Sequence, residues 1–348
     1  MKGKDPRVRE IVRVIAEASP DAILLTNFDW DLENRALSAL SMRLGDAGIS
    51  YQYLFAFRPN TGLRSGLDLD GDGRTNGPGD AQGFGRFTGE GGMAILSRLP
   101  IRADLAEDHS AFLWKDLPFA EVPRKGGRPF PSPEAREIQR LSSTGHWVVP
   151  VVLPDGRLLR LMAFHATPPV FDGSEDLNGL RNADEIRFWR HYLDGRIPGA
   201  GNAGASPPFV ILGDANLDPA DGPGRHEAIM ALLSDPRLCD PAPSSGESAA
   251  LSRRQGGVNR AHKGDPRHDT GDLRDDPGPG NLRLDYLLPS ADLAIRGSGM
   301  IWPDAAAFQD RSRHALIWVD LGIAAGDGAS GAAGISRDTC ASQGAGGQ

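Results

Sequence analysis

The stretch Pro208-Phe209-Val210-Ile211-Leu212-Gly213-Asp214-Ala215-Asn216-Leu217-Asp218-Pro219 joins an apolar run to a polar turn. Four consecutive apolar residues predict a buried strand, and the Gly-Asp-x-Asn that follows predicts its carboxyl end and the turn beyond it. Such strand ends present chemistry, because the turn aims side chains into a crevice of an α/β sheet. Asp214 and Asn216 could hold a metal, activate a water or hydrogen-bond to a phosphoryl oxygen, or they could simply close an Asx turn. Other parts of the chain have to distinguish these interpretations.

The predicted strands are spread along the chain without a linker, which favours one domain. The chain has 348 residues, and its 44 Gly and 27 Pro predict many long loops. We expect a single domain over residues 1–322, with an Asp- and Gly-rich insertion at 58–91 and a polar loop at 241–281. A disordered tail rich in Gly, Ala and Ser is expected at 323–348.

Apolar periodicity predicts the regular elements. Helices are expected at 6–18, 33–47, 181–194 and 225–234, the third with Ile186, Trp189 and Leu193 facing inward. Besides the opening stretch, strands are expected at 21–28, 51–57, 92–98, 147–153, 157–165, 282–288 and 314–321. The Pro-rich residues 103–145 are expected to lie mostly at the surface, and nothing in 241–281 suggests a core.

Composition excludes several classes of protein. The net charge of −8 gives no global basic field toward nucleic acid or anionic lipid, although a local positive cleft or a bound cation leaves a nucleic-acid substrate open. Cys239 and Cys340 are too few for a disulfide framework or a cysteine-rich zinc site. No apolar run reaches transmembrane length, and the N-terminus carries no signal-peptide core.

Three further polar residues end or interrupt apolar runs: His165, Asp285 and His314. A lone His at a strand end is more often a surface or capping residue. An Asp inside an apolar strand, such as Asp285 in 282–288, must be paired or reach a cleft. The attractive pairing is Asp285 with His314, because a buried carboxylate fixes the imidazole tautomer and supports its cationic form.

Six short segments resemble, in this order, the endonuclease/exonuclease/phosphatase superfamily, the fold of pancreatic-type deoxyribonucleases, abasic-site endonucleases and inositol-phosphate phosphatases. Each segment is weakly specific alone, but the ordered set is strongly specific and covers residues 6–321. The segments are Pro20-Asp21-Ala22-Ile23-Leu24-Leu25, Gly92-Met93-Ala94-Ile95-Leu96-Ser97-Arg98, Ala163-Phe164-His165, Gly213-Asp214-Ala215-Asn216, Leu284-Asp285-Tyr286 and Ser312-Arg313-His314.

The resemblance implies an α+β fold, a four-layer α/β/β/α sandwich of two mixed β-sheets flanked by helices, and metal-assisted phosphoester hydrolysis with Mg²⁺ or Mn²⁺. Carried over residue by residue, His314 and Asp285 would be the base and its orienting partner, or would stabilise the pentacovalent phosphorus. Asp214 would handle the water or the leaving group, and Asn216 and His165 would contact the phosphate. Phosphoryl transfer needs mainly in-line positioning and neutralisation of oxygen charge, so these residue types suit it.

The residues at the family's metal-binding positions depart from the family's pattern. The family's strand after the first helix ends in Gln-Glu, whose Glu is the principal Mg²⁺ ligand, and this chain has Thr26-Asn27 there. Arg313 stands where the family has a further acidic residue, and the family's opening strand, with a metal-site Asn, is missing from this sequence. Because Mg²⁺ prefers carboxylate oxygens, these changes predict a weakened metal site.

Three explanations for the departures compete. The missing strand could be encoded upstream of Met1 together with a secretion signal. Asp29, two residues from Asn27, could restore a carboxylate if the strand continues. Alternatively, Arg313 could bind the phosphate itself through its guanidinium fork. Because a guanidinium does not lower the pKa of a water as a metal does, the last case gives a slower enzyme or a phosphate-binding protein.

A second cation signal lies in the insertion. Asp68, Asp70 and Asp72 occupy positions 1, 3 and 5 of a calcium-loop pattern that continues through Arg74, with Gly at position 6. Position 12 is Gly rather than Glu, and Asp80 follows one step late. The alternative is an acidic surface turn. Since alternating carboxylates repel one another without a cation, a structural Ca²⁺ is the favoured prediction.

The sequence therefore predicts a phosphodiesterase or nuclease-like hydrolase, with a catalytically impaired phosphate- or nucleic-acid-binding protein on the same fold as the alternative. Nucleic acid and small phosphodiesters both stay open as substrates, and a monomer is expected. The compartment is left open: periplasmic or secreted if the true start lies upstream, otherwise cytoplasmic.

Overall fold

The structure, a computed structural model, describes residues 5–198, 208–308 and 313–322. One main sheet has the strand order β1-β3-β2, formed by Ala22–Phe28, Gly92–Ser97 and Tyr53–Phe55. The other has the order β11-β9-β8-β7-β4, formed by Asp285–Pro289, Phe209–Asp214, Leu158–His165, Gly145–Val152 and Glu107–Asp108. In this second sheet β8 and β9 are parallel, whereas its other neighbouring strands are antiparallel.

Both faces of the second sheet are buried, as the alternation along its strands shows. Leu161 and Ala163 of β8 belong to a core cluster with Met93 and Ile95 of β3, so this face packs on the first sheet. The residue between them, Met162, belongs to a second cluster on the opposite face. Because neighbouring residues of a strand point to opposite faces, one apolar run supplies both cores.

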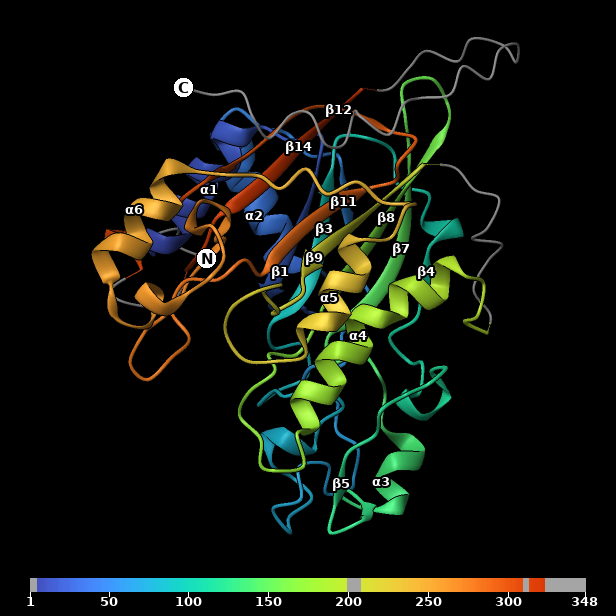
Figure 1. Cartoon of the computed structure of the whole chain (residues 1–348). Helices are drawn as coiled ribbons and strands as arrows, with labels where there is room; N and C mark the ends of the chain where they lie inside the picture. Colours follow the sequence, from blue (N-terminus) through green and yellow to red (C-terminus); the bar gives the residue numbers. More distant parts are fainter. Residues whose placement is uncertain (1–4, 199–207, 309–312, 323–348) are drawn as a thin grey trace.

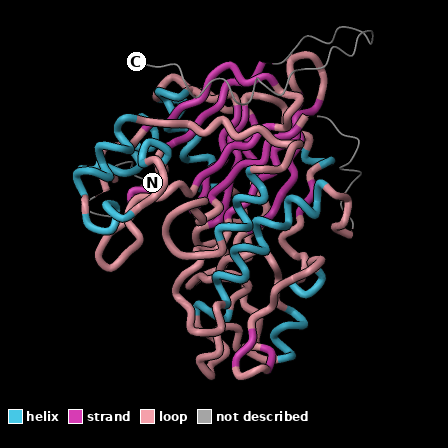
Figure 2. Tube along the Cα trace, in the orientation of Figure 1, coloured by secondary structure: helices cyan, strands magenta, loops and turns pink. Residues whose placement is uncertain are grey.

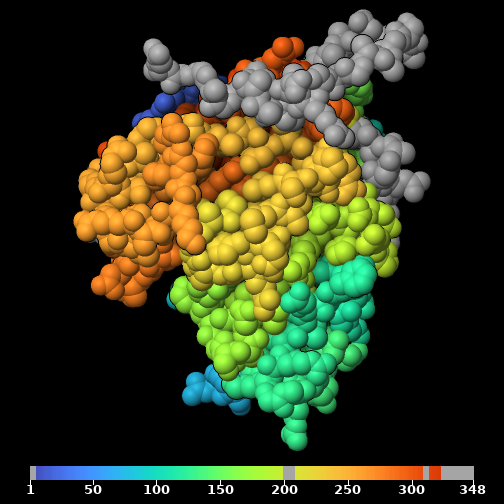
Figure 3. Space-filling model, in the orientation of Figure 1, coloured from blue at the N-terminus to red at the C-terminus, as the bar shows by residue number. Residues whose placement is uncertain are grey.

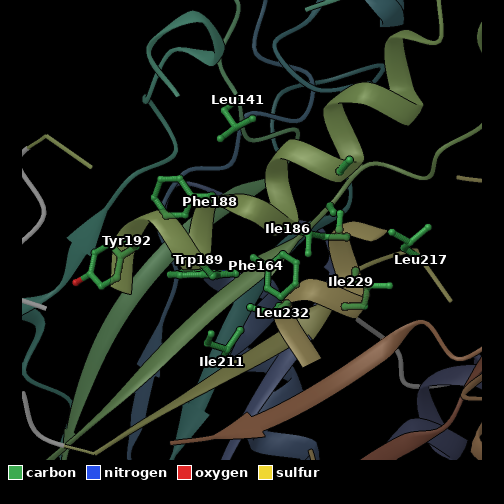
Figure 4. Packing of buried hydrophobic residues seen from close by; sticks show 14 of the residues in the cluster. Leu141, Phe164, Ile186, Phe188, Trp189, Tyr192, Ile211, Leu217, Ile229 and Leu232 are labelled. Carbon is green, nitrogen blue, oxygen red and sulfur yellow. The ribbon is translucent and has the colours of Figure 1, made fainter. Parts of the chain in front are cut away.

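Helices cover the outer face of the second sheet. The second cluster joins Phe164 and Ile211 of the sheet to Ile186 and Trp189 of α4 (Leu177–Leu193) and to residues of α5 (His226–Leu233), as Figure 4 shows. In Figure 1, α4 and α5 lie across the front of this sheet, and the space-filling view shows them as its outer cover (Figure 3).

The first sheet has its own helical cover. Ile15 of α1 (Pro6–Ala18) and Leu44 of α2 (Arg35–Asp46) form a third cluster with Ala94 and Leu96 of β3, the residues whose neighbours face the other sheet. The layers therefore follow one another as helices, sheet, sheet and helices, which confirms the predicted α/β/β/α sandwich. Figure 2 shows the helices mainly at the outside and the strands between them.

The predicted regular elements are confirmed, with ends displaced by a few residues, and the inward residues expected in α4 are all buried. The remaining α-helices and strands of the described residues are α3 (Pro133–Ile138), α6 (Gly246–Gln255), β5 (Arg124–Lys125), β6 (Arg128–Pro129), β10 (Gly271–Asp272), β12 (Ala294–Ile301), β13 (Arg313–His314) and β14 (Leu316–Gly322).

Among the described strands, β1 and β14 each pair on one side only. Strand β1 pairs with β3, and β14 pairs with β12 in a separate two-stranded sheet. Leu24 and Leu321 nevertheless pack against the same cluster between the sheets. Within the described residues, β14 thus borders the core between the sheets without pairing with a strand of either main sheet.

The expectation for residues 241–281 is wrong, and the expectation for 103–145 holds for most of its residues but not for all. Residues 103–145 contribute Trp114, Leu117 and Leu141 to the cluster beneath α4, because widely spaced apolar residues can each reach a core without any period. Residues 241–281 contain α6, whose Leu251 packs with Trp302. Helix α6 escaped prediction because it buries mainly small or polar residues, including Ser248, whose Oγ accepts from Trp302 Nε1 at 2.9 Å.

Strand β12 was also missed, because its sequence Ala-Ile-Arg-Gly-Ser-Gly-Met-Ile carries little apolar periodicity. The expected tail at 323–348 and Ser312 lie outside the described residues. In the part of the chain that is described, no helix combines the length and apolar character needed to cross a membrane.

Candidate active site

Three adjacent strands place three polar side chains in one row. His165 of β8 is the register partner of Asp214 of β9, and Asp214 is the partner of Asp285 of β11. His165 continues the alternation of Leu161 and Ala163, so the row lies on the face that meets the first sheet. Neighbouring strands are about 4.8 Å apart, so the sheet itself brings these residues together.

The Gly-Asp-x-Asn turn has a local reason for each residue. A Cβ at Gly213 would lie 1.9 Å from the carbonyl oxygen of Phe164 on the paired strand, so only glycine fits. Asn216 adopts a left-handed φ of 49°, which asparagine tolerates. Its N–H donates to Asp214 Oδ1 at 2.8 Å, and its Nδ2 donates to Ala166 O at 2.9 Å. The Asx turn is therefore formed, and it also fixes the Asp214 carboxylate.

Asp285 and His314 form the predicted pair. His314 Nδ1 lies 2.8 Å from Asp285 Oδ2, and the same oxygen accepts from Thr270 Oγ1 at 2.7 Å. The Thr270 hydroxyl in turn accepts from the N–H groups of Leu284 and Asp285, each at 3.0 Å. With its acceptor positions used, its single proton is left for the carboxylate.

The charges of these groups are strongly coupled. Burial raises the pKa of Asp214 to about 7; the Asp285 charge adds to this, while His314 and the Asn216 N–H oppose it. Burial disfavours the charged form of His314, but the charge and hydrogen bond of Asp285, helped by Asp214, raise its pKa to about 10. In the chain without metal, His314 is therefore cationic at neutral pH and compensates one of two facing carboxylates.

His165 stands apart in its electrostatics. Burial, with a contribution from the His314 charge, lowers its pKa to about 4, so its imidazole is neutral at pH 7. Its Nε2 lies 3.5 Å from Asp214 Oδ2, and its buried Nδ1 has no hydrogen-bond partner within the described residues. A neutral imidazole beside Asp214 can contact a ligand without adding charge.

The position of Arg313 gives no support to its predicted role in phosphate binding. The residue is only 3% exposed, its Nε donates to Asp272 Oδ2 at 3.0 Å, and its guanidinium stacks 4.9 Å from the centre of the Trp302 ring. It also donates to Pro303 O. A guanidinium committed to these partners holds β13 against β10.

Asn27 lies in the last part of β1, at the irregularity between Leu25 and Phe28, and Asp29 follows the strand. Asn27 is exposed with a left-handed φ of 52°, and Asp29 Oδ1 accepts from Gly91 N at 2.9 Å. Among the described residues, Asp29 joins no convergent group of three acidic or histidine side chains. The structure thus gives no support to Asp29 as a replacement for the missing glutamate.

The facing carboxylates themselves fit a cation. Ligand atoms of Asp214, Asp285 and His314 all lie within 4.8 Å of one another. Burial, with the added charge of Asp285, raises the pKa of Asp214, and a cation beside the carboxylate would favour its ionised form. Carboxylate oxygens suit Mg²⁺ and Mn²⁺, and Mn²⁺ also tolerates imidazole. Asp214 and Asp285 are therefore the residues that would hold a divalent metal here.

The acidic loop forms a second convergent group, in a different combination from the predicted one. Carboxylate oxygens of Asp68, Asp70 and Asp80 lie within 4.8 Å of one another. The buried Asp80 accepts from Leu69 N at 3.1 Å through its Oδ1. Asp72 is not in the group, and its Oδ1 accepts from Arg74 N at 2.7 Å instead. Burial, with the charges of Asp72, Asp80 and Asp68, raises the pKa of Asp70, although the Asp72 N–H opposes this.

Sequence reasoning missed Thr270, which donates to Asp285. It also missed Asn182 and Glu185, two buried residues of α4 that hydrogen-bond to the residues following β8 and β9. A threonine in a polar loop carries no periodic signal. The α4 residues offered one signal, since polar residues at 182 and 185 share the helix face of the inward Ile186 and Trp189.

Comparisons with solved structures agree with this fold. An endonuclease/exonuclease/phosphatase protein from Beutenbergia cavernae is 17% identical with a TM-score of 0.51, over 91% of this chain and 66% of that one, so this chain spans slightly less than two thirds of it. A family protein from Leptotrichia buccalis is 16% identical with a TM-score of 0.50, over 93% and 95% of the two chains.

A search of curated proteins found no match. The family model described as Endonuclease/Exonuclease/phosphatase family matches residues 2–318, nearly the whole chain. By this match, by its fold and by the order of its site residues, the chain belongs to the endonuclease/exonuclease/phosphatase family.

Proposed function

We propose that this chain is a metal-assisted phosphoester hydrolase that acts on phosphodiesters. The observation that carries the proposal is the row of His165, Asp214 and Asp285 at the ends of three adjacent strands, closed by His314. Family membership supports phosphoester chemistry in general, while the preference for diesters and for a particular metal is ours.

The residues divide the work by position and charge. Asp285 holds His314 through Nδ1, which leaves the other ring nitrogen and the positive charge to neutralise a phosphoryl oxygen. Asp214, whose carboxylate is fixed by the Asn216 N–H, would orient the attacking water and accept its proton, or would assist the leaving group. His165 and Asn216 flank Asp214 and would orient the phosphate. A divalent metal held by Asp214 and Asp285 would polarise the phosphoryl oxygen.

The alternative is a phosphate- or nucleic-acid-binding protein with impaired catalysis. It is favoured by the amide at Asn27 and by the engagement of Asp29 with Gly91, which leave the metal with fewer carboxylates than the family pattern has. On this alternative the same row binds phosphate without turning it over.

Hydrolysis of bis(4-nitrophenyl) phosphate with Mg²⁺ or Mn²⁺ tests the proposal. We expect wild-type activity that is lost about 10²- to 10⁴-fold in His314→Ala. His191→Ala, at the far end of α4, is the matched control and should keep wild-type activity. An inactive wild type that still binds inorganic phosphate in calorimetry would favour the alternative, and activity that survives in His314→Ala would reject the assigned site.

We also propose a structural Ca²⁺ in the acidic loop, supported by the convergence of Asp68, Asp70 and Asp80. This ion would be separate from the catalytic metal, because its ligands lie in the insertion at 58–91 rather than at the strand ends. Its role would be to hold the loop in one conformation by neutralising three like charges.

A further inference from the structure

Helix α4 buries an unusual set of polar side chains. Asn182, Asp184 and Glu185 are 0% exposed, and Arg181 is 6% exposed. Burying such groups is costly unless each is hydrogen-bonded, so their partners indicate what they do. Two of them, Asn182 and Glu185, reach past the hydrophobic cluster to the loops that follow β8 and β9.

Glu185 accepts bonds from two separate segments. Its Oε1 accepts from Ser143 N at 2.5 Å and from Ser143 Oγ at 2.7 Å. Its Oε2 accepts from Thr167 N at 2.7 Å. Arg181, one turn earlier on the helix, supplies compensating positive charge. The carboxylate therefore ties the segment before β7 to the residues just after β8.

Asn182 completes the connection from the other side. Its Nδ2 donates to Thr167 O at 2.6 Å and to Ala215 O at 2.8 Å. Thr167 is thus held at its N–H by Glu185 and at its carbonyl by Asn182. Ala215 lies between Asp214 and Asn216 in the chain. One side chain consequently bridges the ends of the two parallel strands.

We propose that Asn182 and Glu185 are positioning residues of the candidate active site, which fix the ends of β8 and β9 and thereby the relative placement of His165 and Asp214. His165 lies two residues before Thr167, and Ala166 N donates to Asp214 O at 2.9 Å, so the two strand ends move together. The inference rests on the proposed function for its effect on catalysis, but the geometric link between α4 and the row does not.

Isosteric variants isolate this role. In Glu185→Gln, an amide nitrogen replaces one acceptor oxygen, so at least one backbone N–H of Ser143 or Thr167 faces another donor. In Asn182→Asp, a carboxylate oxygen faces the carbonyl oxygens of Thr167 and Ala215. Both changes keep the volume of the side chain and push the strand ends away from the helix.

The same helix offers a matched control. Asp184 is as buried as Glu185, and its Oδ2 accepts from Trp114 Nε1 at 2.7 Å and from Glu121 N at 3.0 Å. Those partners belong to the segment beneath α4 and not to the loops behind the row. Asp184→Asn therefore loses comparable buried hydrogen bonds without touching the site.

The test compares the three variants by thermal unfolding and by steady-state hydrolysis of bis(4-nitrophenyl) phosphate with Mn²⁺. We expect similar losses of stability in all three, but a kcat reduced about 10- to 100-fold, with little change in KM, only in Glu185→Gln and Asn182→Asp. Equal kcat in all variants, or an equal loss in Asp184→Asn, would overturn the proposal.

A second readout needs no activity and separates this proposal from the proposed function. The Asn216 N–H donates to Asp214 Oδ1, so its hydrogen exchange reports the geometry of the turn. Faster exchange in Glu185→Gln and Asn182→Asp than in Asp184→Asn supports the positioning role even if the wild type proves inactive. Unchanged exchange in both variants contradicts the role whatever the activity.

Discussion

Asp214 and Asp285 face each other directly as register partners of the antiparallel strands β9 and β11. Like charges at such a position are ordinarily destabilising. Here the pair is held between the His314 imidazole and the Thr270 hydroxyl, which bond to Asp285, and the Asn216 N–H, which bonds to Asp214. The arrangement concentrates negative charge where a cation or a protonated group is needed, and several predictions depend on it.

The stability of the metal-free protein should depend on the ionisation of Asp214. Its pKa is raised from 3.8 to about 7, so the folded state binds the proton more tightly than the unfolded state. Its contribution to stability is then full below about pH 4 and is lost as the pH rises through about 7. Relative to Asp214→Asn, the wild type should lose about 2–4 kcal/mol of unfolding free energy between pH 4 and 7.5.

Urea unfolding of both proteins in EDTA across this range measures the difference. A stability gap that is independent of pH would show that the raised pKa is absent. Adding Mn²⁺ should weaken the pH dependence of the wild type's unfolding free energy, because a bound cation favours the ionised Asp214 carboxylate.

The Thr270 hydroxyl should matter for activity more than its size suggests. Thr270→Val removes the donor to Asp285 Oδ2 and leaves two backbone N–H groups without their acceptor. We expect about 1–3 kcal/mol of lost stability and a lower kcat, because the Asp285–His314 pair loses its orientation. Thr270→Ser keeps all three bonds and should retain both properties. If valine and serine behave alike in hydrolysis assays, the hydroxyl has no part in orienting Asp285.

Arg313 should be a stability residue and not a substrate contact. Its side chain is 2% exposed against Asp272 at 21%, so Arg313→Met leaves a largely buried carboxylate unpaired. We expect a loss of about 2–4 kcal/mol, of which Asp272→Leu in the same chain restores a part. The KM for a phosphodiester should stay near the wild-type value. A large rise in KM at unchanged stability would return Arg313 to the phosphate-binding role.

Calcium should stabilise the acidic loop through the convergent group. We expect Ca²⁺ to raise the Tm of the wild type by several degrees and to leave Asp70→Asn unaffected, since Asp70 joins Asp68 and Asp80 in that group. Asp72→Asn should keep the rise in Tm with Ca²⁺, because Asp72 is a ligand in the sequence pattern but is not in the convergent group. The site is absent if Ca²⁺ shifts none of the three melting curves.

Much of the fold could be predicted from the sequence because its strands are continuous apolar runs buried on both faces. The apolar run 209–212 and the run that ends at His165 predict two of these strands, and the polar residues at their ends predict the site. The pairing of Asp285 with His314 followed because an acidic residue within an apolar strand requires a partner.

The remaining features depend on contacts between distant segments. Thr270 and Glu185 become part of the site only when a loop and a helix pack behind the strand ends. The contacts of Arg313 could not be predicted, because the sequence does not show that Asp272 and Trp302 lie against it. In the acidic loop, the sequence predicted Asp72 and Arg74 together with Asp68, Asp70 and Asp80, whereas only the last three converge.

The most direct test of the central claim follows Mn²⁺ binding and phosphodiester hydrolysis together in the Asp70→Asn background, in which the proposed cation site of the acidic loop lacks one ligand. The proposed function predicts that both rise with the same midpoint, and that Asp214→Asn and Asp285→Asn weaken both about 10-fold or more. Hydrolysis that is indifferent to EDTA, or that persists unchanged in Asp214→Asn, would contradict the account.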